Sequence, residues 1–240
     1  MSDNRFKKNI EQASTSTDIT HHELSRKPIV LSDNNGKYLK LSVDKNISHE
    51  EQILWLHKGG ANSSERFIWL DRNITDLLKK YKRIAIFIWL GTCDLTRKDQ
   101  KFIYLKDNPL PALKSNLQKF KDLTHRYPDL KVNFVHVPYY SIEKWNNLKG
   151  HPNAQVYKND DRQLTDYINE INNYIDELNC QSGANSPRLN QDLVRSRKGK
   201  NRKARYSWNF NLLVDGVHPS PRLAKSWLKS LCRTILRECS

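Results

Sequence analysis

The sequence predicts an α/β domain built on a mainly parallel sheet. Short apolar segments alternate along the chain with longer segments in which apolar residues recur every three or four positions, the pattern of strands that alternate with helices. One short segment, residues 84–90 (IAIFIWL), is apolar throughout, as expected of a strand that is buried on both faces in a parallel sheet. The chain of 240 residues is long enough for one such domain, and it contains no internal repeat.

Three strands and two helices are expected in the first half of the domain. Residues 29–31 and 53–56 are short apolar segments that each run into a turn, and a brief helix follows the first turn around Tyr38. The third strand is the apolar run described above. Ser63 or Ser64 is in place to cap a longer helix, whose apolar residues share one face: Phe67, Leu70, Ile74, Leu77, Leu78 and Tyr81.

The second half continues the alternation. Pro109 or Pro111 opens a helix with an apolar face made by Leu113, Leu117, Phe120, Leu123 and Tyr127. Residues 132–137 are the fourth expected strand. The next helix has an apolar stripe of Leu164, Tyr167, Ile168, Ile171, Tyr174, Ile175 and Leu178. A closing helix begins at Pro221 and directs inward Leu223, Ala224, Trp227, Leu228, Leu231 and Ile235.

The composition outside these segments sets the expected domain limits. Residues 1–27 are polar and rich in Ser and Thr, and we expect a disordered tail there. One domain is expected over residues 28–239, with a basic mobile insertion at about 180–208 that has little hydrophobic periodicity. Between Cys180 and Phe210 the chain holds eight basic residues and one acid, which is nearly half of its formal net charge of +15.

The composition argues against a membrane-spanning, secreted or disulfide-rich protein. No apolar stretch is long enough to cross a bilayer, and the first residues lack the apolar core of a secretory signal. The four cysteines follow neither a metal-binding spacing nor a disulfide framework, and the histidines show no ligand spacing. We therefore expect an intracellular protein of the cytoplasm or nucleus, with no cofactor, no metal site and no membrane partner.

Four polar turns follow apolar segments: residues 32–34 (SDN), 59–62 (GGAN), 91–94 (GTCD) and 215–218 (DGVH). Open α/β sheets bind ligands beyond the carboxyl ends of their strands, so we expect these turns to meet. Their order and context resemble the SGNH/GDSL hydrolase superfamily, whose pattern is Gly-Asp-Ser, Gly, Gly-x-Asn-Asp and Asp-x-x-His. The resemblance extends from about residue 28 onward. It implies a three-layer α/β/α, flavodoxin-like, SGNH-hydrolase-type fold with a mainly parallel sheet.

The resemblance also assigns roles to single residues. Asp215 and His218 match the catalytic pair, in which the Asp orients the imidazole and the His acts as general base. Asn34 stands at the nucleophile position of the family's serine, and its amide has no hydroxyl proton for the base to remove. Gly60 matches a glycine whose N–H belongs to the oxyanion hole. Cys93 stands where the family has an Asn that donates to the oxyanion.

The two departures at Asn34 and Cys93 predict a domain without ordinary serine-esterase activity. The alternative is an SGNH-type esterase or acyl hydrolase that retains activity through Asp215 and His218, which would have to activate water. Cys93 could replace the serine, or it could be a small buried side chain. The Asp and His could also be purely structural. Ser32 lies two residues before the nucleophile position, which is too far away to substitute for it.

Nucleic acid is the partner that the charge favours. Basic residues occur in the insertion, at Arg195, Arg197, Lys198, Lys200, Arg202, Lys203 and Arg205. Others line the outer face of the closing helix, at Arg222, Lys225, Lys229 and Arg233. Together they would bind the phosphates of RNA or DNA in a salt-sensitive way, without base readout. Tyr206 and Trp208 could stack on single-stranded bases or pack in the core.

Other interpretations of the basic residues remain open. The insertion could be a nuclear-import signal on a protein-interaction domain, or a solvated surface without a partner. The resemblance includes degenerate SGNH-like domains: the Oskar-type domain is similar in lacking the triad, and retroelement-encoded proteins also contain such domains. These resemblances imply an association with nucleic acid, although fold similarity does not determine function. The leading hypothesis is a non-catalytic module that binds RNA or DNA.

Overall fold

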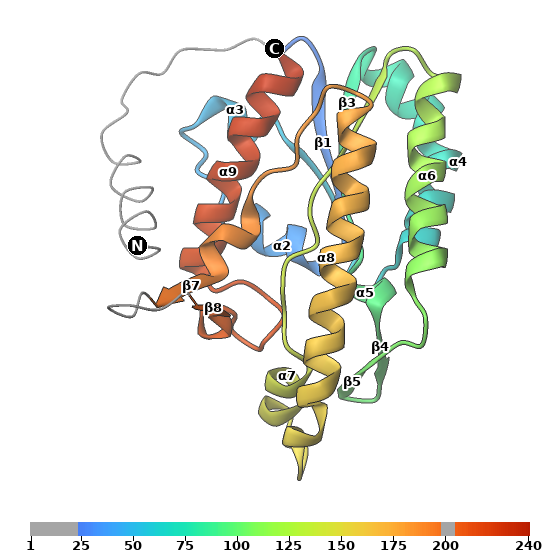
Figure 1. Cartoon of the computed structure of the whole chain (residues 1–240). Helices are drawn as coiled ribbons and strands as arrows, with labels where there is room; N and C mark the ends of the chain where they lie inside the picture. Colours follow the sequence, from blue (N-terminus) through green and yellow to red (C-terminus); the bar gives the residue numbers. More distant parts are fainter. Residues whose placement is uncertain (1–23, 198–204) are drawn as a thin grey trace.

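A four-stranded parallel sheet lies at the centre of the computed structural model, which describes residues 24–197 and 205–240 (Figure 1). The strand order is β2-β1-β3-β6, with bounds Leu54–His57, Lys27–Ser32, Ile84–Trp89 and Leu130–Phe134. The two central strands pair from Lys27 opposite Ile84 to Ser32 opposite Trp89. Every residue of β3 is buried, as its unbroken apolar run predicts.

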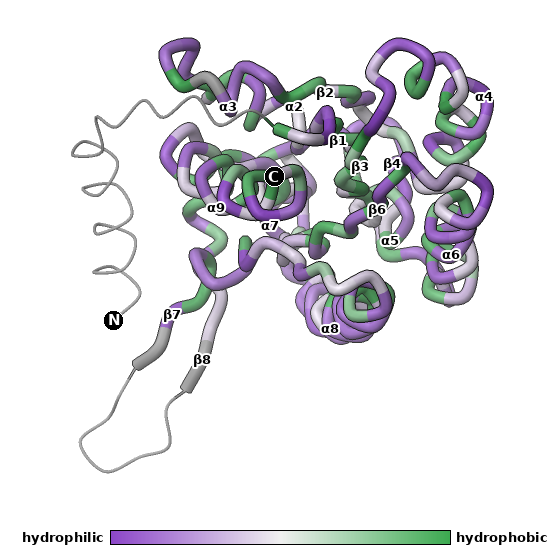
Figure 2. The backbone as a smooth tube through the Cα atoms, turned by 90° about the horizontal axis from the view of Figure 1, so that it is seen from above, coloured by the Kyte–Doolittle hydropathy of each residue, from purple (hydrophilic) through white to green (hydrophobic). Residues whose placement is uncertain are grey.

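Helices cover both faces of the sheet, which gives three layers (Figure 2). Helices α4 (Ser63–Tyr81) and α6 (Leu110–Arg126) pack on one face, and α9 (Pro221–Cys239) packs on the other. The long helix α8 (Lys158–Cys180) lies beside β6 and α6, and the short helix α2 (Asn34–Lys40) contacts β2 and α9. The predicted three-layer α/β/α fold with a mainly parallel sheet is confirmed.

The helices form where the apolar spacing predicts them, and their ends are set by polar caps. The predicted stripes of α8 and α9 are buried, except that Tyr167 and Tyr174 are half-buried. Ser220 caps α9 by accepting a hydrogen bond from the Leu223 N–H at 3.4 Å. At α4 the cap differs from the expectation. Asn62, rather than a serine, accepts from the Glu65 N–H at 2.9 Å, and Ser63 is the first helical residue.

Two asparagines on α8 bond to the backbone of β6 and its extension. Asn179 accepts from the Phe134 N–H and donates to the Phe134 carbonyl, both at 2.8 Å. Asn172, two turns earlier on the helix, accepts from the Val137 N–H at 2.8 Å and donates to the Val137 carbonyl at 3.0 Å. Both amides are buried. Polar side chains on an apolar helix face are thereby satisfied, and the backbone groups of this segment are paired.

A hairpin and several short elements were not expected from the sequence. These are β4 (Thr96–Asp99), β5 (Phe102–Leu105), α3 (Ser48–Glu51), α5 (Thr92–Leu95), α7 (Ile142–Leu148) and the 3₁₀ turns Ala154–Tyr157 and Phe210–Leu212. β4 pairs with β5 in antiparallel fashion, although its sequence TRKD has no apolar alternation. A buried amide holds this hairpin: Asn146 accepts from the Ile103 N–H at 2.9 Å and donates to its carbonyl at 2.8 Å.

The segment expected as a mobile insertion is folded over much of its described length. A 3₁₀ turn, Leu189–Leu193, buries its first and last residues, and Asn190 bonds to the Tyr139 N–H at 2.9 Å. β7 (Val194–Arg197) then pairs with β8 (Arg205–Trp208) in antiparallel fashion. The apolar residues here are too irregularly spaced for a periodicity to reveal the packing, so the expected insertion at 180–208 was drawn too wide.

The last residue of the expected N-terminal tail is part of the central sheet. Residues 1–23 lie outside the described residues, and Lys27 already belongs to β1, where it pairs with Ile84. Within the described part of the chain, none of the helices combines the length and the apolar character that crossing a bilayer requires.

Candidate functional site

Four turns converge on one pocket at the carboxyl ends of the parallel strands. The turn after β1 supplies Asn34, the turn after β2 supplies Gly60, the turn after β3 supplies Cys93, and the loop before α9 supplies His218. All four residues line a cavity of about 480 Å³. Residues that lie far apart in the sequence therefore meet at one edge of the sheet, as expected for this topology.

Asp215 and His218 form a pair held by both side-chain and backbone contacts. The ring Nδ1 lies 2.7 Å from Oδ2 of Asp215, while Oδ1 accepts from the backbone N–H groups of His218 at 2.8 Å and Val217 at 3.0 Å. Burial alone would raise the pKa of the Asp215 carboxyl, but these hydrogen bonds outweigh it and lower the pKa. The Asp is therefore ionised at neutral pH and holds the imidazole in one orientation.

A glycine allows the loop between these two residues to form. Gly216 has a φ of +89°, a region that disfavours side chains, and a Cβ there would lie 2.9 Å from the Trp145 backbone nitrogen. The Gly216 carbonyl accepts from the Ser141 N–H at 2.9 Å, which joins the loop to the start of α7. The Asp-Gly-Val-His sequence thus fits a tight loop that places Asp and His side by side.

Asn34 is hydrogen-bonded to the other nitrogen of the same ring. Its Nδ2 lies 3.0 Å from Nε2 of His218. Because Nδ1 faces the ionised Asp215, it bears the ring proton, which leaves Nε2 to accept the amide N–H. A general base of a serine hydrolase needs this same tautomer. The Asn34 amide therefore occupies the hydrogen-bonding place on Nε2, and it offers no atom that can attack a substrate.

Aromatic rings hold the imidazole from the sides. Tyr38, one turn after Asn34 on α2, stacks on His218 with ring centroids 4.9 Å apart and an interplanar angle of 24°. Trp145 of α7 lies 5.9 Å from the same ring in a tilted arrangement. These contacts restrict the ring to the orientation in which it meets both Asp215 and Asn34.

Ser32, the serine nearest in sequence to Asn34, points away from the pocket lining. Its side chain is fully buried, and its hydroxyl donates to the Asp33 carbonyl at 3.1 Å. A Cβ on Gly36 would lie 1.9 Å from the Ser32 Oγ, so the hydroxyl packs under the first turn of α2. The Ser32 hydroxyl is therefore engaged within the protein and does not line the cavity.

Asp33 has a structural place beneath the pocket. It is almost fully buried and caps α2 by accepting from the Asn35 N–H at 2.8 Å. Burial raises the pKa of its carboxyl, against the lowering effect of hydrogen bonds from Asn35 and Thr92. The cap fixes the direction in which the neighbouring Asn34 side chain leaves the helix, so Asp33 positions that amide.

The two expected oxyanion-hole positions both line the pocket, and they differ in what they can donate. Gly60 has a φ of +73° and open space where a Cβ would be, so its backbone is accessible to a ligand. Burial, and then the nearby carboxylates of Asp33 and Asp94, raises the pKa of Cys93 to about 12. Cys93 is therefore a neutral thiol at physiological pH, which argues against its use as a replacement nucleophile.

Sequence reasoning missed a further amide at the same place. Asn62 lines the pocket, and its Oδ1 is engaged in capping α4. Only its amide nitrogen is left as a donor toward a ligand. The turn is held by Asp94, which accepts from both the N–H and the hydroxyl of Ser63, at 3.1 and 2.6 Å. The signal was present in the GGAN turn, but Asn is so common in turns that its role could not be singled out.

The unexpected β4–β5 hairpin adds basic residues to the rim of the pocket. Arg97, Lys98 and Lys106 all line the cavity. Lys106 donates to the Cys93 carbonyl at 2.9 Å, and the Arg97 guanidinium lies 5.3 Å from the ring centre of Tyr104. Together with the amides of Asn34 and Asn62, they place several hydrogen-bond donors around a pocket that is otherwise lined by side chains such as Ile103, Trp145 and Val217.

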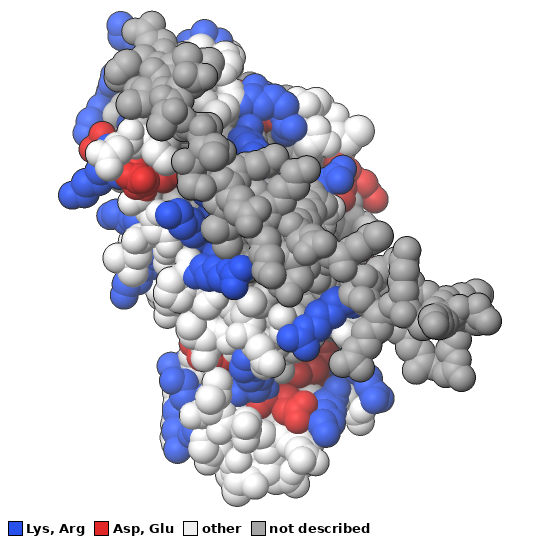
Figure 3. Space-filling view, turned by 90° about the vertical axis from the view of Figure 1, so that its left-hand side faces the viewer, with Lys and Arg blue, Asp and Glu red and all other residues white. Residues whose placement is uncertain are grey.

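The expected nucleic-acid contacts are only partly within the described residues. Arg195 is exposed at the start of β7, as are Arg222, Lys225 and Arg233 on α9, whereas Lys229 is half-buried. Arg197 and Arg205 belong to β7 and β8. Lys and Arg side chains recur over the α9 side of the molecule, with acidic side chains in smaller groups (Figure 3). The remaining four predicted contacts lie outside the described residues: Lys198, Lys200, Arg202 and Lys203.

One aromatic residue beside the basic segment is engaged within the protein. Trp208 stacks on Tyr139 with centroids 3.7 Å apart and an interplanar angle of 23°, and it is half-buried. One face of its indole is therefore covered, which limits the base stacking considered for it. The side chain of Tyr206 lies outside the described part of the chain.

The fold and the pocket together define an α/β domain with a pocket at the carboxyl ends of its parallel strands. Solved structures agree with this assignment. A GDSL-like lipase from Bacteroides thetaiotaomicron superposes with a TM-score of 0.59 and 11% identity, over 97% of this chain and 98% of that one. The lipase/acylhydrolase from Enterococcus faecalis gives a TM-score of 0.55 and 14% identity, over 90% and 97%. No protein-family model and no curated protein matches the sequence. The chain therefore has the SGNH/GDSL hydrolase fold.

Proposed function

We propose that this chain is a non-catalytic SGNH-like domain that binds RNA or DNA through the basic surface beside α9. The hydrogen bond between Asn34 and His218, 3.0 Å long, is the observation that supports the absence of hydrolysis. Exposed cationic side chains on α9 and on the segment packed against it support the nucleic-acid partner.

The pocket retains the base of a serine hydrolase without a group for it to activate. Loss of the serine of a catalytic triad costs a factor on the order of 10⁶ in rate. Loss of one oxyanion donor costs about 10²–10³. Asn34 and Cys93 stand at both positions, so a serine-type mechanism is blocked at the attacking atom and weakened at the oxyanion. The thiol of Cys93 is neutral and does not replace the nucleophile.

A groove beside α9 is suited to phosphate groups. The segment that follows α8 and the outer side of α9 enclose a cavity of about 760 Å³ lined by Arg188, Arg233 and Arg237. Arg237 pairs with Glu238 at 2.8 Å. Among the described residues, Arg188 and Arg233 have no ion-pair partner, so both guanidinium groups are available to a polyanion. Arg222 and Lys225 extend the exposed cationic surface toward the start of α9.

Fluorescence anisotropy with labelled single-stranded RNA and DNA tests the nucleic-acid proposal. We expect salt-dependent binding by the wild-type chain and weaker binding by Arg188→Ala/Arg233→Ala, with the log–log salt slope reduced by about 2 because two phosphate contacts are lost. The matched control is Lys79→Ala/Lys80→Ala, which removes two exposed charges from α4 on the opposite face. Equal losses in both double variants, or no binding by the wild type, would contradict the proposal.

A second candidate function is ester hydrolysis through Asp215 and His218 with water as the nucleophile. The intact contact between them, 2.7 Å long, favours it. The test is hydrolysis of a short-chain acyl ester by the wild-type chain and by His218→Ala. Activity of the wild type that His218→Ala abolishes would establish this second function and exclude the non-catalytic domain. Equal background rates for the wild type and His218→Ala would instead support a domain whose pocket does not catalyse ester hydrolysis.

A further inference from the structure

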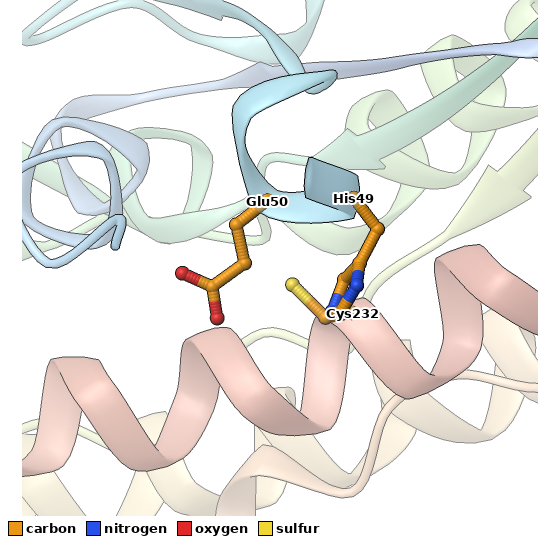
Figure 4. A group of neighbouring side chains, drawn as sticks. All are labelled: His49, Glu50 and Cys232. Atoms are coloured by element: carbon orange, nitrogen blue, oxygen red, sulfur yellow. The ribbon is translucent and has the colours of Figure 1, made fainter. Parts of the chain in front are cut away.

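Three side chains of metal-ligand type meet away from the pocket, between α3 and α9. They are His49 and Glu50 of α3 and Cys232 of α9, and their ligand atoms all lie within 4.8 Å of one another. In Figure 4, the side chains of His49 and Glu50 extend from α3 toward α9, one on each side of the Cys232 sulfur. The three residues offer one imidazole nitrogen, one carboxylate oxygen and one sulfur.

This donor set matches the preference of zinc. Zn²⁺ binds Cys sulfur at about 2.3 Å, and His nitrogen or carboxylate oxygen at about 2.0–2.2 Å, usually with four ligands in a tetrahedron. Ligand atoms in such a tetrahedron are about 3.5 Å apart. The observed separations of up to 4.8 Å require only a small inward movement of the short helix α3. Three protein ligands would leave the fourth position open to water or another donor.

Burial makes the cluster unusual for groups of this kind. Glu50 is 4% exposed and Cys232 is 3% exposed. The Glu50 carboxylate accepts a hydrogen bond from the Asp44 N–H at 2.8 Å, which fixes its place beside α9. A buried carboxylate and a buried sulfur that lie this close together can serve as ligands of one divalent cation.

Two lysines near the cluster carry positive charges that would repel a bound metal ion. Lys225 and Lys229 lie close enough to Glu50 to stabilise its ionised form. Their charge would reduce the affinity for a metal ion, so the site differs from a structural zinc centre surrounded by thiolates. The two lysines also provide a test. Removal of one lysine charge would strengthen metal binding, whereas it would weaken an ion pair between that lysine and Glu50.

We propose that His49, Glu50 and Cys232 bind Zn²⁺ and thereby join α3 to α9. On binding, a sulfur–zinc bond forms and the thiol proton leaves to solvent, so the affinity would increase with pH. The histidine and cysteine spacing in the sequence predicted no metal site. Sequence spacing does not reveal this cluster, because its ligands come from opposite ends of the domain and meet only through the packing of α3 on α9.

Zinc titration of the EDTA-treated chain in competition with a chromogenic chelator tests this site. We expect one zinc ion per wild-type chain and binding at least about tenfold weaker in Cys232→Ser and His49→Gln, since even outer-sphere changes cost this much. Cys180→Ser, which removes an exposed thiol at the end of α8, is the matched control and should bind like the wild type. Lys229→Met should bind zinc more tightly than the wild type.

Cobalt substitution identifies the sulfur ligand directly. The wild-type chain loaded with Co²⁺ should show a thiolate-to-cobalt charge-transfer band that Cys232→Ser lacks and Cys180→Ser retains. Zinc should also raise the Tm of the wild type more than that of His49→Gln. Because His49 is only half-buried, this variant decides the matter if Cys232→Ser does not fold. Zinc binding that is equal in the wild type and in His49→Gln, or a band that persists in Cys232→Ser, would overturn the proposal.

Discussion

The two sides of the His218 ring differ in what they retain of a hydrolase. On the Nδ1 side, Asp215 is 2.7 Å away, ionised and held by two backbone N–H groups. On the Nε2 side, Asn34 fills the hydrogen-bonding place at 3.0 Å with an amide. A neutral acceptor nitrogen is satisfied equally by an amide N–H and by a hydroxyl. The hydrogen bond to Nε2 and a hydrolytic reaction therefore make different demands, since the first needs only a donor and the second needs an atom that can attack.

The largest expected effect comes from placing a serine on the Nε2 side of the His218 ring. Asn34→Ser combined with Cys93→Asn should create hydrolysis of a short-chain acyl ester, because His218 already has the tautomer that activates a serine. The gain is bounded by the factor on the order of 10⁶ that loss of a triad serine costs. Initial rates against the wild type measure it.

The control for this gain adds His218→Ala to the same two changes. If the triple variant hydrolyses the ester as fast as the double variant, the new rate does not pass through His218 and the comparison between the two sides of the ring fails.

The second-largest effect is expected from a backbone change on the Nδ1 side of the ring, in the loop between Asp215 and His218. Gly216→Ala places a Cβ 2.9 Å from the Trp145 nitrogen at a φ of +89°, so we expect a loss of about 1–3 kcal/mol in the free energy of unfolding. Urea denaturation measures it. Gly183→Ala is the matched control, because its φ is +63° but nothing lies near its Cβ. Equal losses at the two glycines would show that backbone strain alone, rather than the close contact, holds the loop.

The pH dependence of stability should separate two carboxylates with opposite shifts. The pKa of Asp215 is lowered below 3.8, so its ionised form stabilises the fold above that pH and this stability is lost on acidification. Burial raises the pKa of Asp161 to about 6, so its contribution is greatest below 3.8 and is lost as the pH rises through 6.

Urea titrations of Asp215→Asn and Asp161→Asn against the wild type measure both contributions. The deficit of Asp215→Asn should be constant near neutral pH and shrink below pH 3.8. The stability of Asp161→Asn relative to the wild type should rise between pH 3.8 and about 6. Parallel pH profiles for the two variants would contradict the opposite shifts.

The smallest effect on stability is expected at Ser32, which precedes Asn34 by two residues. Its hydroxyl donates to the Asp33 carbonyl, so Ser32→Ala should cost about 0.5–1.5 kcal/mol in stability. In the Asn34→Ser/Cys93→Asn background it should leave the kcat for ester hydrolysis unchanged. A fall in kcat without a loss of stability would identify Ser32 as part of the chemistry.

Much of the fold was accessible from the sequence because its signals are local. The apolar run at 84–90 became β3, the stripe from Leu164 to Leu178 became α8, and the four polar turns met at one pocket. Strand burial and helix periodicity are imposed residue by residue, so a single sequence records them. The turns could be brought together because parallel strands end at a common edge.

The features that were missed depend on contacts between distant residues. The hairpin at 96–105 is fixed by the Asn146 amide, and Asn62 acts in the pocket only because Asp94 and Ser63 hold its turn. The 3₁₀ turn after Arg188 packs without any regular spacing. The His49–Cys232 contact likewise has no counterpart in the local sequence. Such features arise from tertiary packing, and neither propensity nor periodicity contains them.

The asparagines on α8 have a consequence for how the protein behaves at high concentration. A parallel sheet that ends at β6 would expose a row of unpaired N–H and C=O groups, and such edges recruit strands from other chains. Asn172 and Asn179 occupy these groups at Val137 and Phe134 in the way a neighbouring strand would. A strand added from another chain would therefore have to displace these two side chains before it could pair at Phe134 and Val137.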